Sequence, residues 1–245
     1  MNNNYYGSFA GTDIYFSFRH KETYKYFGNW IKEAKERHRV HIRVPQSDIE
    51  EWISRWGRFD DAFTEFGLSV FSVSDYLLLY DKCVFHAASI VYKDKAYLFT
   101  AKSGTGKTTQ LMNWMQLYGN ETKIINGDKP ILSAENDKLW VFPSPWKGKE
   151  RIGEDSIYAE LGGIIYLEQG KENFVSRLSA SDAAIPIMNR FLCTVENEEI
   201  IHGICRLEEK ILCTVPIWKA INTGDLDSTR MIHDILNKEK NNHDV

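Results

Sequence analysis

One short stretch combines two glycines, a lysine and four hydroxyl side chains, and it is well suited to bind phosphate. It reads Ser103-Gly104-Thr105-Gly106-Lys107-Thr108-Thr109. Glycines let successive backbone N–H groups turn toward an anion, and Lys107 adds a positive charge for the β- and γ-phosphates. The Thr108 hydroxyl is suited to hold Mg²⁺, and a helix that begins here adds its positive N-terminal end. The stretch therefore predicts a loop that binds a nucleoside triphosphate.

The residues on either side of this loop have the patterns that a phosphate loop requires. Tyr97-Leu98-Phe99-Thr100 is an apolar run typical of a strand, and Thr109 to Met115 is compatible with a helix. The first position of the loop pattern holds Ala101 instead of glycine, and a methyl group is tolerated there if φ is negative. A glycine-containing hairpin turn is the competing interpretation, and it leaves the flanking strand and helix patterns unexplained.

A triphosphate site also needs a carboxylate near the γ-phosphate, either to hold the metal or to accept a proton from the acceptor. Asp128 follows the apolar run Ile124-Ile125, about twenty residues after Lys107. In α/β sheets such a residue sits at the C-terminal end of a strand near the ligand. Asn126-Gly127-Asp128 is also a strong turn signal. Motif position alone leaves both readings of Asp128 open.

Three segments together resemble the HPr kinase/phosphorylase family, which shares its nucleotide-binding core with phosphoenolpyruvate carboxykinase. The segments are His86-Ala87-Ala88-Ser89-Ile90-Val91, the loop at 103–108 and Asn126-Gly127-Asp128-Lys129-Pro130. The resemblance covers about residues 75 to 220. Within the family, this chain is most similar to small stand-alone kinase-like proteins of bacterial gene clusters. Some of those resemble lasso-peptide kinases, which phosphorylate a serine of a ribosomally made precursor peptide. The N-terminal 70 residues do not resemble the N-terminal domain of HPr kinase.

The resemblance implies roles for individual residues. Lys107 would bind the phosphates and Thr108 the Mg²⁺, while Asp128 matches the second aspartate of a family pair, whose role is general base toward the serine hydroxyl. The first aspartate of that pair is replaced by Gly127, which removes one expected carboxylate. His86 matches a family histidine near the phosphates; a core histidine bonded to the backbone is the alternative.

A further segment, 145–151, lies where the family has a glycine-containing loop with an acidic residue. Glu150 would complete the metal shell together with Thr108 and Asp128. Lys147, Lys149 and Arg151 could meet phosphate or an acidic acceptor, and a solvated basic loop is the alternative for each of them.

Composition narrows the class of protein. The chain has 245 residues, a formal net charge of −4 and a pI of about 6.0, which argues against a nucleic-acid partner. The sequence shows no basic segment followed by an apolar run and no eighteen consecutive apolar residues, so we expect no signal peptide, no membrane partner and a cytoplasmic location. Cysteines 83, 193, 205 and 213 form no CxxC pair and are expected to be buried thiols.

The elements that must position these residues follow from apolar spacing. Helices are predicted at 24–37, 47–56, 76–79 (capped by Ser74-Asp75), 107–117, 179–191 and 227–236. Strands are predicted at 13–18, 40–44, 84–92, 97–100, 123–132, 139–142, 163–167 and 210–215. The fold class is α/β with a mixed sheet and, by resemblance, a phosphate loop of the HPr kinase and carboxykinase type. We expect an N-terminal α+β region (1–75) that binds acceptor or partner, a kinase core (76–237) and a polar, disordered tail (238–245).

Residues and resemblance together lead to an ATP- and Mg²⁺-dependent phosphotransferase that modifies a serine of a peptide or small protein. A non-catalytic nucleotide sensor is the alternative, because Gly127 stands where a carboxylate is expected. A kinase for a small hydroxylated metabolite such as serine is another. Carboxykinase chemistry would need arginine and metal-ligand positions that the sequence does not reveal, and no guanine-specifying Asn-Lys-x-Asp occurs. The choice between ATP and GTP and a homo-oligomeric state stay open.

Overall fold

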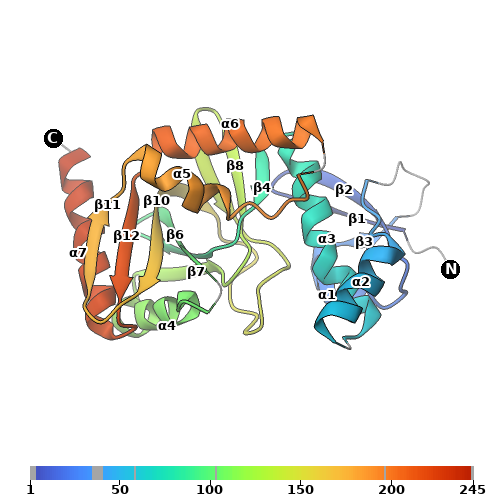
Figure 1. The fold of residues 1–245 in the computed structure, drawn as a ribbon, viewed down its shortest axis with the longest axis horizontal. Helices are drawn as coiled ribbons and strands as arrows, with labels where there is room; N and C mark the ends of the chain where they lie inside the picture. Colours follow the sequence, from blue (N-terminus) through green and yellow to red (C-terminus); the bar gives the residue numbers. More distant parts are fainter. Residues whose placement is uncertain (1–3, 35–40, 58, 103, 196, 244–245) are drawn as a thin grey trace.

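Two β-sheets form the framework of the molecule, with helix α3 packed between them (Figure 1). The computed structural model describes residues 4–34, 41–57, 59–102, 104–195 and 197–243. The small sheet is antiparallel, in the order β2-β1-β3. Its strands are β1 (Asn4–Phe9), β2 (Thr12–Ser17) and β3 (Lys32–Glu33).

The large sheet has nine strands and a mixed topology. Its main path is β4-β8-β9-β10-β6-β5-β7, and β12 and β11 extend it beside the second half of β10. The pairings of β10 with β6 and with β12 are parallel, whereas the others are antiparallel. The strands are β4 (Lys82–Val84), β5 (Ala88–Tyr92), β6 (Lys95–Ala101), β7 (Thr122–Asn126), β8 (Ile131–Glu135), β9 (Lys138–Phe142), β10 (Ala159–Gln169), β11 (Phe174–Arg177) and β12 (Ile217–Asn222). The expected α/β class with a mixed sheet is confirmed.

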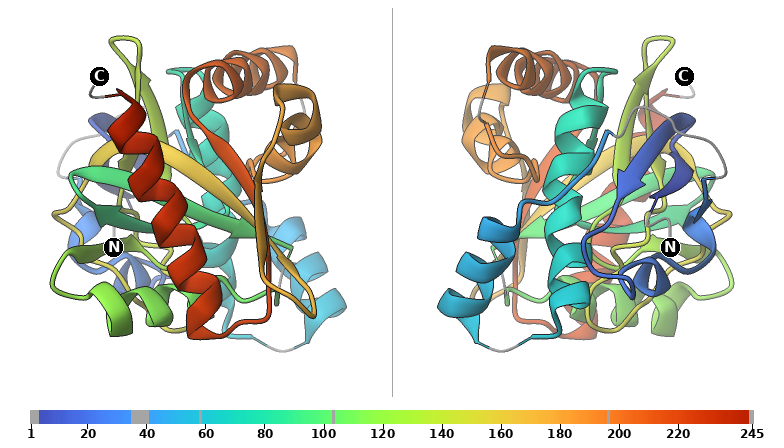
Figure 2. Two further views of the ribbon diagram at one scale, coloured as in Figure 1. Left: turned by 90° about the vertical axis from the view of Figure 1, so that its left-hand side faces the viewer. Right: turned by 90° about the vertical axis from the view of Figure 1, so that its right-hand side faces the viewer.

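Helices cover both faces of the large sheet (Figures 1 and 2). On one face α5 (Ala180–Met188) and α6 (Glu198–Thr214) bury residues such as Ile187 and Leu207 against the strands. On the other, α4 (Lys107–Tyr118) and α7 (Leu226–His243) bury Leu111, Trp114 and Ile232. Continuous apolar strands such as β6 are explained by this double cover.

A third core joins the N-terminal region to the rest. Helix α3 (Asp61–Leu78) buries Val70, Val73 and Leu77 against the small sheet, and Trp146 from the large-sheet side enters the same cluster. The expected boundary near residue 75 therefore falls inside α3. Helices α1 (Tyr24–Phe27) and α2 (Gln46–Trp56) and the 3₁₀ turn η1 (Gly28–Trp30) complete this region.

Several predicted elements are confirmed, among them the strands at 13–18 and 139–142 and the helices at 47–56, 107–117, 179–191 and 227–236. The helix predicted at 24–37 is wrong over its described residues: it stops at Phe27, because Gly28 takes φ +58° and Ile31 is already extended, and residues 35–37 lie outside the described part of the chain. The predicted strand at 40–44 is reduced to a single bridge between Ile42 and Phe16, and residue 40 lies outside the described part of the chain.

Longer apolar runs account for most of the other errors. The predicted strand at 210–215 is the last turn of α6, which Asn197 caps and whose buried residues recur at helical spacing. Residues 76–79 end α3 instead of starting a helix, and Ser74 Oγ accepts from the Val84 N–H (2.9 Å). The predicted strands at 84–92 and 123–132 are each interrupted, the first before β5 and the second between β7 and β8.

Two remaining expectations concern the cysteines and the tail. All four cysteines are free; Cys83 is buried, but Cys205 and Cys213 are exposed, so the expectation of buried thiols is wrong for those two. Helix α7 continues to His243, well into the segment expected to be a disordered tail. None of the described helices is long and apolar enough to cross a membrane.

Candidate functional site

The loop that follows β6 presents bare backbone. Strand β6 is buried at the centre of the large sheet and delivers this loop, and α4 begins at Lys107 directly after Gly106. Gly104 and Gly106 take φ values of +77° and +102°, which favour glycine. A Cβ atom at Gly104 would meet nothing within 4 Å, and one at Gly106 only Thr109, at 3.9 Å. Ser103, a predicted ligand, lies outside the described residues.

The hydroxyl groups of the loop have different environments. Thr105 Oγ1 donates to the Lys102 carbonyl (2.7 Å) and closes the turn, so it stabilises the loop itself. Thr108 lies in the first turn of α4 and lines the hollow in front of the loop. Thr109 is exposed and does not line that hollow. Thr108 is thus the threonine of α4 that is placed to meet a ligand.

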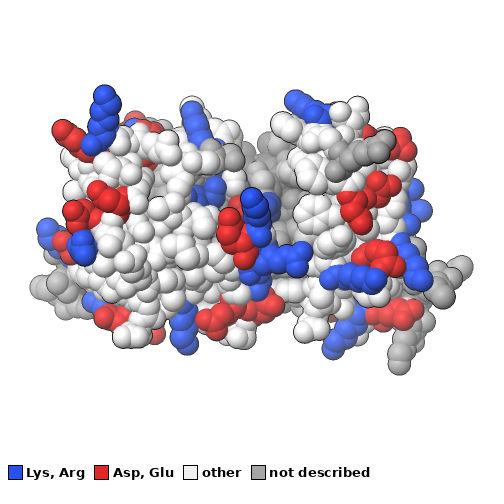
Figure 3. All heavy atoms as spheres, turned by 90° about the horizontal axis from the view of Figure 1, so that it is seen from below, with Lys and Arg blue, Asp and Glu red and all other residues white. Residues whose placement is uncertain are grey.

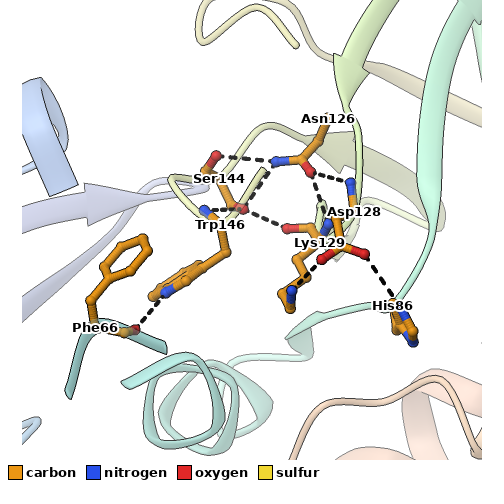
Figure 4. A network of polar contacts seen from close by, with 7 residues as sticks. All are labelled: Phe66, His86, Asn126, Asp128, Lys129, Ser144 and Trp146. Carbon is orange, nitrogen blue, oxygen red and sulfur yellow. Dashed lines mark hydrogen bonds and ion pairs between the residues drawn. The ribbon is translucent and has the colours of Figure 1, made fainter. Parts of the chain in front are cut away.

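On the facing side, Asn126 at the end of β7 holds the turn that carries Asp128 (Figure 4). Its Oδ1 atom accepts from the backbone N–H groups of Asp128 and Lys129, both at 2.8 Å. Its Nδ2 atom donates to the carbonyl and the hydroxyl of Ser144, both at 3.1 Å. Asn126 is fully buried. Asn126-Gly127-Asp128 is therefore a turn, and this turn aims a carboxylate into the hollow.

Two cationic or hydrogen-bonding groups hold the Asp128 carboxylate. His86 Nε2 lies 3.3 Å from Oδ1, and Lys129 Nζ forms an ion pair with Oδ2 (Figure 4). Burial raises the pKa of Asp128, but the hydrogen bond from His86 and the charge of Lys129 outweigh it and lower the pKa to about 2. The His86 ring therefore faces the site, while its backbone N–H and carbonyl pair with Arg190 and Thr100.

Both sides line one hollow of about 370 Å³. Its walls are Gly104, Thr105, Gly106, Lys107, Thr108, Gly127, Asp128, Gly148, Lys149 and Glu150. The structure thus brings Lys107, Thr108, Asp128 and Glu150 together from three separate segments. Burial lowers the pKa of Lys107, Asp128 raises it, and the charges of Arg190 and Lys129 lower it further. This excess of positive charge favours an anionic ligand.

Gly127 lies where an aspartate was expected, and the neighbouring loop packs closely against it. Its N–H donates to the Ile152 carbonyl (2.9 Å), and a Cβ atom there would lie 3.2 Å from the Lys147 carbonyl and 3.3 Å from that of Ile152. The loop at 147–152 therefore fills the space beside Gly127. In the described part of the chain no three His, Cys, Asp or Glu side chains form a metal-binding cluster. A Mg²⁺ ion bound with a triphosphate takes one or two carboxylates and phosphate oxygens, which the donor set of Thr108, Asp128 and Glu150 fits.

The charged residues of the loop at 145–151 have two different roles: one stabilises the loop, and others line the hollow. Lys147 Nζ donates to the Gly153 carbonyl (2.7 Å) and pairs with Asp155 (2.6 Å), so it stabilises the loop. Lys149, Glu150 and Arg151 are exposed, and Lys149 and Glu150 line the hollow. Lys149 and Glu150 are therefore the residues of this loop that can reach a ligand in the hollow.

Sequence patterns missed two residues of the site. Arg190, just after α5, donates from Nη1 to the Ala101 carbonyl at the end of β6 (2.6 Å). Its Nε atom is buried and has no hydrogen-bond partner among the described residues. Arg190 is not among the residues that line the hollow, but its charge lies close enough to Lys107 to contribute to the lowered pKa of that ammonium. No motif surrounds Arg190, whereas Asn126 could have been recognised as an Asx turn residue.

Comparisons with known proteins find a likeness among solved structures only. No family model matches this chain, and no curated protein does. Among solved structures, the chain is similar to the Hpr(Ser) kinase/phosphatase from Coxiella burnetii, with a TM-score of 0.40 and 12% sequence identity. The similarity covers 66% of this chain and 99% of that chain. A similarity at this level carries no functional conclusion for this chain.

Proposed function

We propose that this protein is a Mg²⁺-dependent kinase that transfers the γ-phosphoryl group of ATP to a serine hydroxyl of a peptide or small protein. One observation carries the proposal: the bare loop with Lys107 and the carboxylate of Asp128 face each other across a single hollow. Phosphoryl transfer needs this pairing of phosphate-binding groups with an acceptor for the hydroxyl proton.

The phosphate end of the reaction is assigned to the loop and the cations around it. Backbone N–H groups of 104–108 and the start of α4 bind the phosphates, and Lys107 and Arg190 balance the charge that shifts toward the leaving ADP. Mg²⁺, when bound at Thr108, Asp128 and Glu150, would neutralise the β- and γ-oxygens.

The acceptor end is assigned to Asp128. With a pKa of about 2 the carboxylate is ionised at neutral pH and accepts a hydrogen bond from the serine hydroxyl, which orients the oxygen toward phosphorus. Because so acidic a group is a weak base, the proton moves late, after the new O–P bond has made the hydroxyl acidic. The bond from the γ-phosphorus to the bridging oxygen breaks as the new O–P bond forms, and ADP leaves.

Asp128→Asn tests this assignment. We expect phosphoryl transfer from ATP to a serine peptide to fall by about 10² to 10⁴, with the affinity for nucleotide measured without Mg²⁺ nearly unchanged. The matched control is Asp137→Asn, because the Asp137 side chain is fully exposed in the hairpin between β8 and β9 and does not line the hollow. Wild-type turnover by Asp128→Asn would remove Asp128 from the mechanism. The same assay with GTP determines the base preference.

A nucleotide sensor is the second candidate, and one contact favours it. Trp146 Nε1 donates to the Phe66 carbonyl (2.9 Å) and joins the loop beside Asp128 to α3 of the N-terminal region (Figure 4). Nucleotide occupancy could reach that region through this bond. Micromolar nucleotide binding without ATP consumption, whatever peptide is supplied, would favour the sensor over the kinase.

A further inference from the structure

The phosphate hollow continues into two further hollows toward the N-terminal region. It shares Asp128, Gly148 and Lys149 with a hollow of about 510 Å³. That second hollow shares Phe63, Gly67 and Lys129 with a third, of about 410 Å³. Each lies in the size range that holds a drug-sized ligand, so a single small metabolite would leave most of this groove empty.

The far end of the groove is aromatic and exposed. Trp52 and Trp56 are one turn apart on α2, and the centroids of their rings lie 5.9 Å apart. The ring centroids of Phe59 and Phe63 lie 6.4 Å apart. Their exposed fractions run from 40% for Trp52 to 59% for Trp56. Exposed apolar side chains that gather in a hollow, instead of being scattered, mark an interaction site.

Gly67 keeps the floor of the groove open. It is an exposed residue inside α3, and a Cβ atom there would meet nothing within 4 Å. Glycine inside a helix costs about 1 kcal/mol relative to alanine, so the fold gains nothing from it. The absent side chain leaves space that belongs to both the second and the third hollow.

The middle of the groove is basic. Four basic side chains and one carboxylate, Asp128, are among the described residues that line the second hollow. Lys129 and Lys147 have acidic partners, whereas no described carboxylate pairs with Lys149 or Arg151. Figure 3 shows Lys and Arg side chains gathered where the two halves of the molecule meet. An occupant of this part should carry negative charge beside its hydroxyl group.

We propose that the acceptor is a peptide segment with an acidic residue close to the target serine and a bulky apolar residue further along. The serine lies at Asp128, the acidic residue at Lys149 and Arg151, and the apolar side chain among Trp52, Trp56 and Phe63. The assignment of the serine end rests on the proposed kinase function, whereas the docking of the flanks does not. The aromatic end selects the substrate, and the hollow at the loop does the chemistry.

Two peptide arrays test this. The probes are immobilised peptides of about twelve residues with randomised flanks, one array with a central serine and one with alanine in its place. The first is treated with ATP and read by phosphate incorporation, and the second is read by bound protein without nucleotide. We expect both arrays to select Asp or Glu near the centre and Trp, Phe or Leu further along.

Three variants test whether the preference for acidic and apolar flanking residues comes from the groove. Trp56→Ala should weaken binding to apolar-flanked peptides about tenfold, as loss of an aromatic anchor does. Gly67→Leu should block the groove without disturbing α3, because leucine is the better helix former. Lys149→Glu with Arg151→Glu should replace the acidic preference by a basic one. Phe174→Ala is the control, because Phe174 on β11 is exposed to 56%, nearly as much as Trp56.

The outcomes separate this inference from the kinase proposal. Phosphorylation without selection of flanks, or selection that Trp56→Ala and Gly67→Leu leave intact, overturns the docking groove and spares the kinase. Selection on the alanine array without any phosphorylation on the serine array supports the groove and overturns the kinase. A preference for free serine over every peptide overturns the groove.

Discussion

The loop after β6 and the turn after β7 face each other across one hollow, but they are built in opposite ways. The loop is bare: a Cβ atom at Gly104 would touch nothing within 4 Å. The turn is crowded: the loop at 145–151 packs against it so closely that a Cβ atom at Gly148 would lie 2.9 Å from the Cβ atom of Asp128, and Asn126 is fully buried. The open side leaves its N–H groups for a ligand, whereas the packed side fixes its carboxylate before a ligand arrives.

This difference separates function from stability. Substitutions in the open loop should change nucleotide binding and turnover with little effect on folding, because few protein atoms contact it. Substitutions in the packed turn should lower the free energy of unfolding, because they disturb buried hydrogen bonds or close contacts. Four measurements test this difference between the loop and the turn.

Lys107→Ala should have the largest effect. We expect phosphoryl transfer to fall by about 10³ or more, because the positive charge opposite the transferred group is lost. Thermal stability should be unchanged or slightly higher, since burial and the charges of Arg190 and Lys129 already disfavour the ammonium. Initial rates and melting curves, with the exposed Lys123→Ala as control, test both parts. A strongly destabilised Lys107→Ala would show that the loop is not independent of the fold.

Asn126→Ala should give the largest loss of stability. Its side chain accepts from two half-buried backbone N–H groups and donates to the buried Ser144, and all of these partners would lose that hydrogen bond. We expect the free energy of unfolding to fall by about 3 kcal/mol, measured by urea denaturation. The exposed Asn189→Ala, just after α5, is the control and should change it by less than about 0.5 kcal/mol. Equal losses in the two variants would contradict a preorganised turn.

Gly148→Ala and Gly104→Ala compare the two sides directly. Both glycines have nearly the same φ, +76° and +77°, so the strain of a left-handed alanine, about 1 kcal/mol, is common to both variants. Only Gly148 is crowded, by the Asp128 side chain. We expect Gly148→Ala to be less stable than Gly104→Ala by about 2 kcal/mol in urea denaturation. No difference between them would mean that the turn can relax away from the added methyl group.

The open loop is also the part of the site that sequence could predict. Its glycines, Lys107 and Thr108 are consecutive, and the strand and helix patterns beside them fix where it lies. Asp128 needed a second signal, the end of a strand. Arg190 could not be found, because only the tertiary packing of the segment after α5 brings it to Ala101.

The same distinction explains the errors in the elements. The α6 error arose because Ile211-Leu212-Cys213 is too short a run to separate strand from helix, and only the longer spacing from Ile200 decides it. The helix predicted from Tyr24 ends at Gly28, which takes φ +58°, and Phe27 before it is buried in the cluster that packs on the small sheet. The sequence could predict features that consecutive residues form, such as the phosphate loop. It could not predict features that depend on tertiary packing, such as the position of Arg190.

The smallest effect expected is a pH dependence that belongs to the packed side. The pKa of Asp128 is about 2 in the folded protein against 3.8 for a free aspartate, because His86 and Lys129 favour its ionised form. A lowered folded pKa stabilises the protein above the unfolded pKa, and this stability is lost as pH falls toward 2. The shift contributes about 2 kcal/mol to the free energy of unfolding at neutral pH, and about 1 kcal/mol of this contribution should be lost between pH 6 and pH 3. Asp128→Asn cannot titrate, so its free energy of unfolding should fall less than that of the wild type over this range, by that amount. If the free energies of unfolding of the two proteins changed with pH in the same way, His86 and Lys129 would not stabilise the Asp128 carboxylate more than water does. The turn would then be as open to solvent as the loop.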